Sequence, residues 1–205
     1  LERDRPGIVA APPSVLRLLA EEKLAGRLAA QPHRIVSVAE VLDPLDACVI
    51  ERAFGPPIHQ IYQCTEGFLA STCRYGTLHL NEDIVHIDKE KVAGDPSGRK
   101  FVPIVTDFSR RTQPIIRYRL NDLLTEAAAP CPCGSVFTAV ERIEGRCDDI
   151  FYLENASGAL VPVFPDLIAR AVIASSPAIA EYRVIQEEAR AVRVELALAA
   201  DADRA

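Results

Sequence analysis

Several features are missing from this sequence, and each absence narrows what the protein can be. No stretch approaches the ~18–20 apolar residues that a membrane-spanning helix needs. The first residues, LERDRPGIVAAPP, lack the basic start and apolar run of a secretory signal. Methionine is absent throughout, the first position included. We therefore expect no membrane partner, a cytoplasmic location, and a chain that is a piece of a longer protein.

What is present is ordinary for a globular protein. The chain has 205 residues, of which 49% are hydrophobic and 25% charged, enough for one compact domain and a small appendage. The net charge of −6 makes a nucleic-acid partner a poor expectation. In a reducing compartment, spaced cysteines indicate metal binding or reactivity before disulfides. The cysteines are Cys48, Cys64, Cys73, Cys131, Cys133 and Cys147.

The first sixty residues alternate between strand-like and helix-like patterns. Short connections between such segments are typical of a parallel α/β unit. The expected elements are a helix over 15–28 with Ser14 as its N-cap, a strand over 34–40, a helix that begins after Asp43 and stops at Gly55, and a strand over 58–64.

After Gly67 the pattern changes to short, turn-separated, β-rich segments, which predict a mainly antiparallel layer or a distorted barrel. The expected elements are a strand pair over 76–88, a hairpin or loop over 95–100, and strands within 101–108, 113–120, 122–127 and 135–145. The fold class predicted up to this point is α/β plus a β-rich subdomain.

A boundary is expected near Asp148. Beyond it we predict a helix over 165–175 and strands over 179–187 and 191–199, too few to bury a full core. Residues 1–147 would then belong to a large lobe, and residues 148–205 would be the start of a truncated small α+β lobe.

The stretch IYQCTEG places a carboxylate directly after a strand. Glu66 offers the hard oxygen ligand that Mg²⁺ prefers, Thr65 a hydroxyl for a phosphate, and Tyr62 a flat face for a ring. The alternative is that these residues merely end a strand, because short motifs are hypotheses.

Two later stretches add groups of the same kind. In PIIRYRLND, Asp122 follows an apolar run and offers a carboxylate to the hydroxyls of a ribose. In IEGRCDDIF, Gly145 permits a tight bend and Arg146 supplies a planar cation suited to phosphate. The alternatives are a surface strand with alternating charges and a charged turn.

Together, the three stretches resemble the motifs of the adenylate-forming superfamily, Tyr-x-x-Thr-Glu, Tyr-Arg-x-x-Asp and Gly-Arg-x-Asp-Asp. The closer resemblance is to the branch of phenylacetate–CoA ligase and its coenzyme-adenylylating relatives. PPSVLRLLAE, SVAEVLDP, LHLNED, PIIRYR and CPCG carry it, and it covers roughly residues 8–170. The resemblance implies that this chain consists of the C-terminal part of the large AMP-binding lobe and the start of the small lobe.

The resemblance also implies roles for single residues. In the reaction that the resemblance implies, a carboxylic acid and ATP give an acyl-adenylate and pyrophosphate. The acyl group is then transferred to coenzyme A or another acceptor. The matched positions are Glu66 for the Mg²⁺ ligand, Thr65 beside the phosphate, Tyr62 and the loop Ser37, Val38, Ala39 and Glu40 for the adenine pocket, Asp122 for the ribose, Arg146 for the motif arginine, and Asp148 for the hinge.

The departures from the family are equally informative. The Ser/Thr/Gly-rich loop that grips the ATP phosphates is not in this sequence, and the last lysine is Lys100, so the lysine expected late in the small lobe is missing. We expect this chain alone to be inactive as a ligase, because phosphoryl chemistry depends on such groups. The alternative is a non-catalytic, zinc-stabilised module that binds a nucleotide or a protein. The partners expected of the whole protein are a small carboxylic acid, coenzyme A and a second copy of the chain in a homodimer.

Cys131 and Cys133 can bind one metal through both thiolates. A structural zinc needs four ligands. Cys73 and His79 lie in the same β-rich region as Cys131 and Cys133, and strands that are this far apart in sequence commonly pair in such a region. The alternative is separately buried thiols and a surface histidine. The phenylacetate–CoA ligase branch has similar Cys and His positions, so the resemblance favours a Cys₃His zinc site. Cys64 has no histidine close in sequence, and we expect no covalent role for it.

Overall fold

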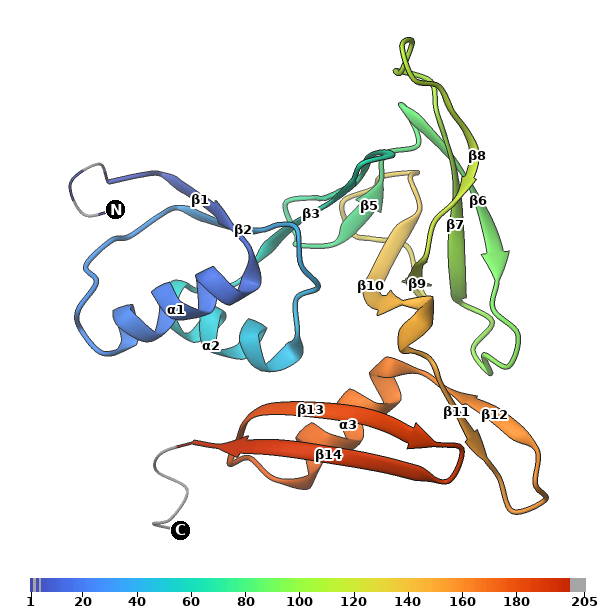
Figure 1. The fold of residues 1–205 in the computed structure, drawn as a ribbon. Helices are drawn as coiled ribbons and strands as arrows, with labels where there is room; N and C mark the ends of the chain where they lie inside the picture. The colour runs from blue at the N-terminus through green and yellow to red at the C-terminus, as the bar shows by residue number, and fades with distance from the viewer. Residues whose placement is uncertain (2, 4, 200–205) are drawn as a thin grey trace.

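A computed structural model describes residues 1, 3 and 5–199, and one large sheet runs through most of them (Figure 1). The sheet has ten strands in the order β1-β2-β3-β4-β5-β10-β9-β7-β6, and β8 pairs with β7 off this path. In chain order the strands are β1 (Ile8–Ala11), β2 (Arg34–Ser37), β3 (His59–Cys64), β4 (Gly67–Thr72), β5 (Leu78–Leu80), β6 (Val85–Lys91), β7 (Lys100–Asp107), β8 (Ile115–Arg119), β9 (Asp122–Glu126) and β10 (Ala139–Arg146). The predicted α/β class with a β-rich part is confirmed.

The predicted parallel unit is present at the N-terminal end of the sheet. Strand β1, which the sequence did not predict, pairs in parallel with β2, and β2 pairs in parallel with β3. Helices α1 (Pro13–Leu24) and α2 (Pro44–Phe54) connect these strands and pack together against the sheet (Figure 1). The buried side chains between them are Leu16, Ala20, Ile35, Ile50 and Ile58.

Helix α2 begins and ends as the sequence predicts. The Asp43 side chain accepts a 2.8 Å hydrogen bond from the Leu45 amide, and Pro44 occupies the first helical position. Gly55 ends the helix with a φ of 86°, a left-handed conformation that glycine adopts without strain. Both caps are local signals, which is why the bounds are right.

Helix α1 differs from its prediction at both ends. Pro12 is the N-cap residue and Pro13 the first helical residue, so the predicted N-cap Ser14 is wrong. Pro13, at the first helical position, has no N–H that needs a hydrogen-bond partner. The amide of the next residue, Ser14, donates to the Glu40 carboxylate at 3.4 Å. The helix stops at Leu24, short of the predicted residue 28, because Gly26 turns the chain with a φ of 74°.

From β3 onward every neighbouring pair in the large sheet is antiparallel, as predicted. The stretch 76–88 does form two strands, β5 and β6, but the prediction that they pair with each other is wrong. β5 pairs with β4 and β10, while β6 pairs with β7. The predicted hairpin or loop over 95–100 lies in the connection between β6 and β7, and its last residue, Lys100, already begins β7. The pairing of β5 with β10 is what brings residues of the 70s beside residues of the 130s.

The C-terminal elements form two hairpins and a helix below the large sheet (Figure 1). They are the 3-10 helix Cys147–Asp149, β11 (Phe151–Glu154), β12 (Leu160–Val163), α3 (Pro165–Ser175), β13 (Ile179–Glu188) and β14 (Ala191–Leu198). Helix α3 and the last two strands were predicted, whereas the β11–β12 hairpin was not. No helix within the described ranges has both the length and the apolar character to cross a membrane.

Contacts on two sides help to join these elements to the rest of the chain. Phe164 and Ile150 are buried against Leu123 of β9. On the other side, the Tyr182 hydroxyl donates a 2.8 Å hydrogen bond to Oδ2 of Asp43, so β13 touches the start of helix α2. The hairpin β13–β14 accordingly lies beneath α1 and α2 in Figure 1.

Candidate functional site

The three predicted motifs meet at one place in the fold. Tyr62 lies on β3, Asp122 is the first residue of β9, and Arg146 is the last residue of β10. Asp122 and Arg146 are direct partners in the antiparallel pairing of β9 and β10. Residues distant in sequence therefore form one polar group at an edge of the β-rich layer.

The geometry of this group centres on the Asp122 carboxylate. Its Oδ2 accepts a 2.6 Å hydrogen bond from the Tyr62 hydroxyl, and its Oδ1 lies 3.2 Å from Nε of Arg146. Burial, and next the charge of Asp122, raise the pKa of Tyr62, so the hydroxyl keeps its proton and donates. The carboxylate is thus held in one orientation from both sides.

Glu66 and Thr65 occupy the turn between β3 and β4, at the end of the strand that carries Tyr62. Thr65 is exposed and Glu66 is partly buried. Burial, then a hydrogen bond to Glu66, raise the pKa of the Cys64 thiol to about 11. A thiol with that pKa is protonated at neutral pH, in line with the expected lack of a covalent role for Cys64.

The predicted adenine loop lies on the neighbouring strand. Ser37 ends β2, is buried, and pairs with Gln60 of β3, two residues before Tyr62. Ala39 turns the chain with a φ of 69°, and the Glu40 carboxylate lies at the N-terminus of helix α1. This loop is therefore beside the strand of Tyr62.

The predicted hinge lies directly after the Arg146 position. Oδ2 of Asp148 accepts a 2.8 Å hydrogen bond from the side chain of Asn121, and Oδ2 of Asp149 accepts one of 2.9 Å from the Arg146 amide. Gly145 has a φ of 128°, and a Cβ there would lie 3.0 Å from the Asp149 carboxylate. The bend therefore requires glycine, as the sequence indicated; Asp149 belongs to the predicted Gly-Arg-x-Asp-Asp motif, while the role of Asn121 had no sequence signal.

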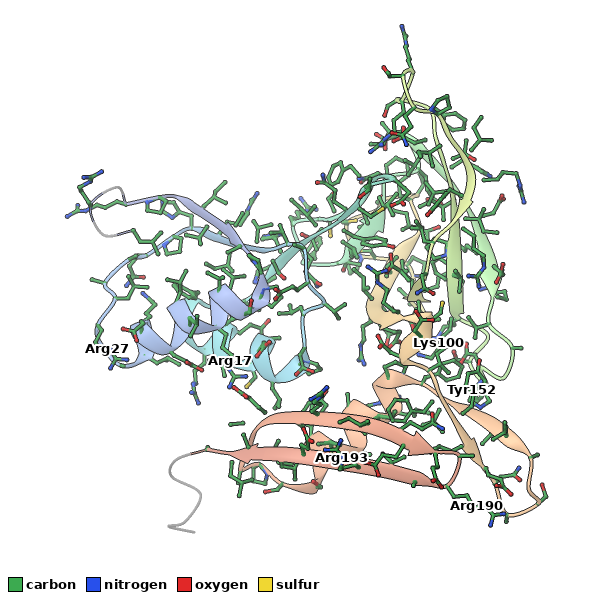
Figure 2. All side chains as sticks on the ribbon, in the orientation of Figure 1. Arg17, Arg27, Lys100, Tyr152, Arg190 and Arg193 are labelled. Carbon is green, nitrogen blue, oxygen red and sulfur yellow. The ribbon has the colours of Figure 1, made fainter. Side chains whose placement is uncertain are left out.

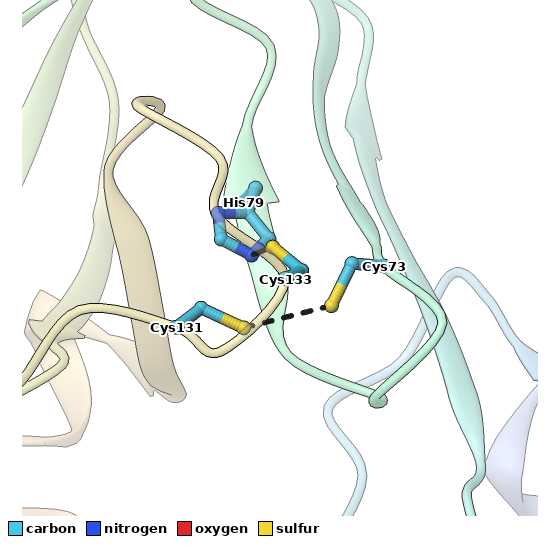
Figure 3. A group of neighbouring side chains, drawn as sticks. All are labelled: Cys73, His79, Cys131 and Cys133. Carbon is cyan, nitrogen blue, oxygen red and sulfur yellow. Dashed lines mark hydrogen bonds between the residues drawn. The ribbon is translucent and has the colours of Figure 1, made fainter.

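The four predicted metal ligands form a compact cluster (Figure 3). The ligand atoms of Cys73, His79, Cys131 and Cys133 all lie within 4.8 Å of one another. The Cys73 and Cys131 sulfurs are 3.7 Å apart, and the Cys133 sulfur is 3.4 Å from Nε2 of His79. With a zinc–sulfur bond of about 2.3 Å, tetrahedral sulfur ligands are roughly 3.8 Å apart. The residues therefore fit a zinc ion.

The surroundings of the cluster also suit a metal. Nδ1 of His79 lies 3.2 Å from the carbonyl oxygen of Phe137, which fixes the ring and leaves Nε2 for a metal. Hydrogen bonds from Thr77 and from the Cys133 amide lower the pKa of Cys131 to about 6. That thiol is a thiolate at neutral pH, the form that binds zinc.

A parallel α/β unit that continues into a β-rich antiparallel layer is the fold expected for part of an adenylate-forming enzyme. No family model matches the chain. The fold and the comparisons that follow nevertheless confirm the resemblance to that superfamily.

Among curated proteins, the chain is similar to phenylacetate-coenzyme A ligase of Thermus thermophilus, with 23% identity over 88% of this chain and 42% of the relative. Among solved structures, it is similar to a 2-hydroxyisobutyryl-CoA ligase bound to an acyl-adenylate, with a TM-score of 0.71, 21% identity, and coverage of 95% of this chain and 44% of the other. The amide bond synthetase McbA of Marinactinospora thermotolerans gives a TM-score of 0.67 at 18% identity, covering 100% and 45%. The chain thus spans less than half the length of these relatives.

Proposed function

We propose that this chain carries the nucleotide-binding part of an ATP-dependent ligase that activates a small carboxylic acid as its acyl-adenylate. The observation that carries this proposal is the Asp122 carboxylate, which Tyr62 and Arg146 hold in place. Each carboxylate oxygen has a lone pair left for a ribose hydroxyl. Relatives crystallised with 2-hydroxyisobutyryl-type and anthranoyl adenylates support this assignment.

The adenine ring would lie against the loop Ser37–Glu40. This loop follows β2, which pairs with β3, the strand of Tyr62. The base and the ribose would therefore be recognised side by side. Because Tyr62 is 7% exposed and bonded to Asp122, its contribution is to orient the carboxylate beside the base.

Thr65 and Glu66 would serve the phosphates. A turn at the end of β3 presents a hydroxyl and a carboxylate together, and Glu66 is the group suited to a Mg²⁺ ion. The bound Mg²⁺ would neutralise phosphate charge. Thr65 is exposed and free to donate to a phosphate oxygen.

In the whole protein, a carboxylate oxygen of the acid would attack the α-phosphorus of ATP, and the bond to pyrophosphate would break. A thiol such as that of coenzyme A would then take the acyl group and release AMP. The sequence has no lysine after Lys100 and no Ser/Thr/Gly-rich phosphate loop. We therefore expect this chain alone to bind a nucleotide without turning it over.

We also infer that the lobes divide at Asp148, residues 1–147 belonging to the AMP-binding lobe and residues 148–205 to the small lobe. The 3-10 helix Cys147–Asp149 lies between the last strand of the large sheet and the first small hairpin, which supports a pivot there.

A structural zinc bound by Cys73, His79, Cys131 and Cys133 completes the proposal. The ligands come from the β4–β5 turn, from β5, and from the loop before β10. The metal would fasten this loop to the strands that lie between those of Tyr62 and Asp122 in the sheet. Its role would be structural, because all four ligand positions are supplied by the protein.

The test is nucleotide binding measured by calorimetry. We expect AMP to bind, 2′,3′-dideoxy-AMP to bind more weakly, and Asp122→Asn to remove that difference, because the carboxylate recognises the ribose hydroxyls. Asp88→Asn is the control, since Asp88 also pairs with an arginine, Arg117, elsewhere in the sheet. Equal binding of both nucleotides, or no AMP binding, would contradict the proposal. Pyrophosphate exchange by this chain alone would contradict its expected inactivity.

A further inference from the structure

A buried ion pair lies behind the proposed nucleotide site. Nζ of Lys100, the first residue of β7, is 2.7 Å from Oε1 of Glu144 on β10. Only 7% of the Lys100 side chain and 3% of the Glu144 side chain are exposed. Figure 2 shows Lys100 at the end of the large sheet that faces the small hairpins.

The pair is connected to β9 as well. The Thr125 hydroxyl donates to Oε1 of Glu144 and lies 3.3 Å from Nζ of Lys100. Within the described residues, Oε2 of Glu144 is buried and has no hydrogen-bond partner. Removing two charges from water offsets most of what a buried ion pair gains, so such a pair is weak evidence for a role in stability alone.

The position of Glu144 indicates a different role. Glu144 and Arg146 are two residues apart and would lie on the same face of a regular strand. Here the Glu144 side chain is 3% exposed and the Arg146 side chain 67% exposed. An irregularity in the β9–β10 register between Ile143 and Gly145 separates them. The strand is therefore bulged where it presents Arg146 to Asp122.

The same pair reaches the segment after the hinge. Nζ of Lys100 lies 5.2 Å from the centre of the Phe164 ring, and Phe164 is 1% exposed. Phe164 directly precedes helix α3. Lys100 thus touches both the bulged strand, through Glu144, and the proposed small lobe.

We propose that Lys100 and Glu144 are positioning residues for the nucleotide site. By anchoring the bulged end of β10 to β7 and β9, they aim Arg146 at Asp122, and through Phe164 they couple this geometry to the small lobe. The inference rests on the proposed function, because the proposed function is what gives Asp122 and Arg146 a nucleotide to bind.

The first test needs no ligand. The ¹⁵N NMR signal of the Arg146 Nε–H group, assigned by its absence in Arg146→Lys, reports the contact with Asp122. We expect Glu144→Gln to shift or broaden this signal, because the neutral amide no longer offers an opposite charge to Lys100. The matched control is Glu126→Gln, which alters a second lysine–glutamate pair of the sheet. There, Lys89 lies 3.0 Å from Glu126 and 5.6 Å from the Phe101 ring.

The second test measures AMP and 2′,3′-dideoxy-AMP binding at a temperature at which every variant is folded. We expect Glu144→Gln to weaken AMP binding about three- to tenfold and to reduce the discrimination between the two nucleotides, as coupled neighbours do. Glu126→Gln should change either value less than about twofold. Lys100→Arg, which keeps the charge, should retain more affinity than Lys100→Met.

The outcomes separate the two proposals. If the wild-type chain does not bind AMP, the proposed function fails, and the Arg146 signal still decides whether Glu144 positions that side chain. If AMP binds but Glu144→Gln leaves the Arg146 signal, the affinity and the discrimination unchanged, the positioning role is overturned. A Glu144→Gln variant that loses thermal stability and keeps the discrimination between the nucleotides would show a structural role only.

Discussion

The Tyr62 hydroxyl donates a 2.6 Å hydrogen bond to Oδ2 of Asp122, across 60 positions of sequence. Tyr62 is buried within the main core, so its hydroxyl is fixed by the packing of its ring. Arg146 holds the other carboxylate oxygen at 3.2 Å. The orientation of the Asp122 carboxylate is therefore set before any nucleotide binds, which lowers the entropy lost on binding.

Replacing Tyr62 by phenylalanine should weaken AMP binding while the fold is retained. The change removes one hydrogen bond to a charged group, a loss of about 1.5–3 kcal/mol shared between stability and the orientation of Asp122. We expect the AMP affinity measured by calorimetry to fall about three- to tenfold. Tyr75→Phe is the control, because Tyr75 is 52% exposed and lies outside the site. Equal affinities for the two variants would show that Asp122 needs no help from Tyr62.

The metal cluster predicts one zinc per chain. Replacing Cys131 by serine removes one of the four ligands, and we expect the zinc content measured by elemental analysis to fall from one per chain toward zero. Because metal binding contributes directly to folding free energy, the melting temperature should fall by about 10 °C or more. Cys48→Ser is the matched control, since Cys48 is exposed and not part of the cluster.

A purified wild-type chain that holds no metal and is insensitive to chelators would contradict the zinc proposal. A variant that loses zinc without losing stability would separate metal binding from the proposed structural role.

Zinc retention should depend on pH in one direction. Hydrogen bonds from Thr77 and the Cys133 amide lower the pKa of Cys131 to about 6, below its ordinary value of 9.0. A group with a lowered pKa stabilises the folded state above its unfolded value and loses that contribution as the pH falls through the folded one. Protons also compete with zinc for the thiolate. Because bound zinc disfavours protonation of the thiolate further, we expect a chelating dye to detect little zinc release at pH 7.5 and release that begins only below about pH 6 and increases as the pH falls. Release that is independent of pH between 7.5 and 5 would contradict this assignment.

The sequence was sufficient where the signals are local or where a short motif demands a particular chemistry. Asp43 and Gly55 mark the ends of helix α2 by capping alone. The residues alone leave a site of Cys131 and His79 open, and the family resemblance favours it; the pairing of β5 with β10 does bring the two residues together.

The sequence was insufficient where the partner of a segment matters. Alternation predicts two strands within residues 76–88, but it does not say that these strands, β5 and β6, pair with different neighbours. Lys100 and Glu144 are charged residues that ordinarily lie in solvent, and only the packing of three strands and Phe164 shows that they are buried together. Such long-range burial has no signature in composition or spacing.

A polar contact between β13 and helix α2 gives a last prediction, on the mobility of the proposed small lobe. Oδ2 of Asp43 accepts the 2.8 Å hydrogen bond from Tyr182, while Oδ1 of the same side chain caps helix α2. Nη2 of Arg17 donates to the Ala180 carbonyl oxygen at 3.2 Å nearby. The single Asp43 carboxylate therefore serves the helix and the hairpin together.

Tyr182→Phe removes only the contact to the hairpin, whereas Asp43→Ala removes that contact and the cap. We expect both variants to increase amide hydrogen exchange in β13 and β14, because each frees the hairpin from helix α2. Only Asp43→Ala should also increase exchange in the first turn of α2, at a cost of about 1 kcal/mol of stability. Tyr152→Phe, on the β11–β12 hairpin, is the control and should leave β13 unchanged. Unchanged exchange of β13 and β14 in Tyr182→Phe would show that the hairpin is held by other contacts, such as that of Arg17.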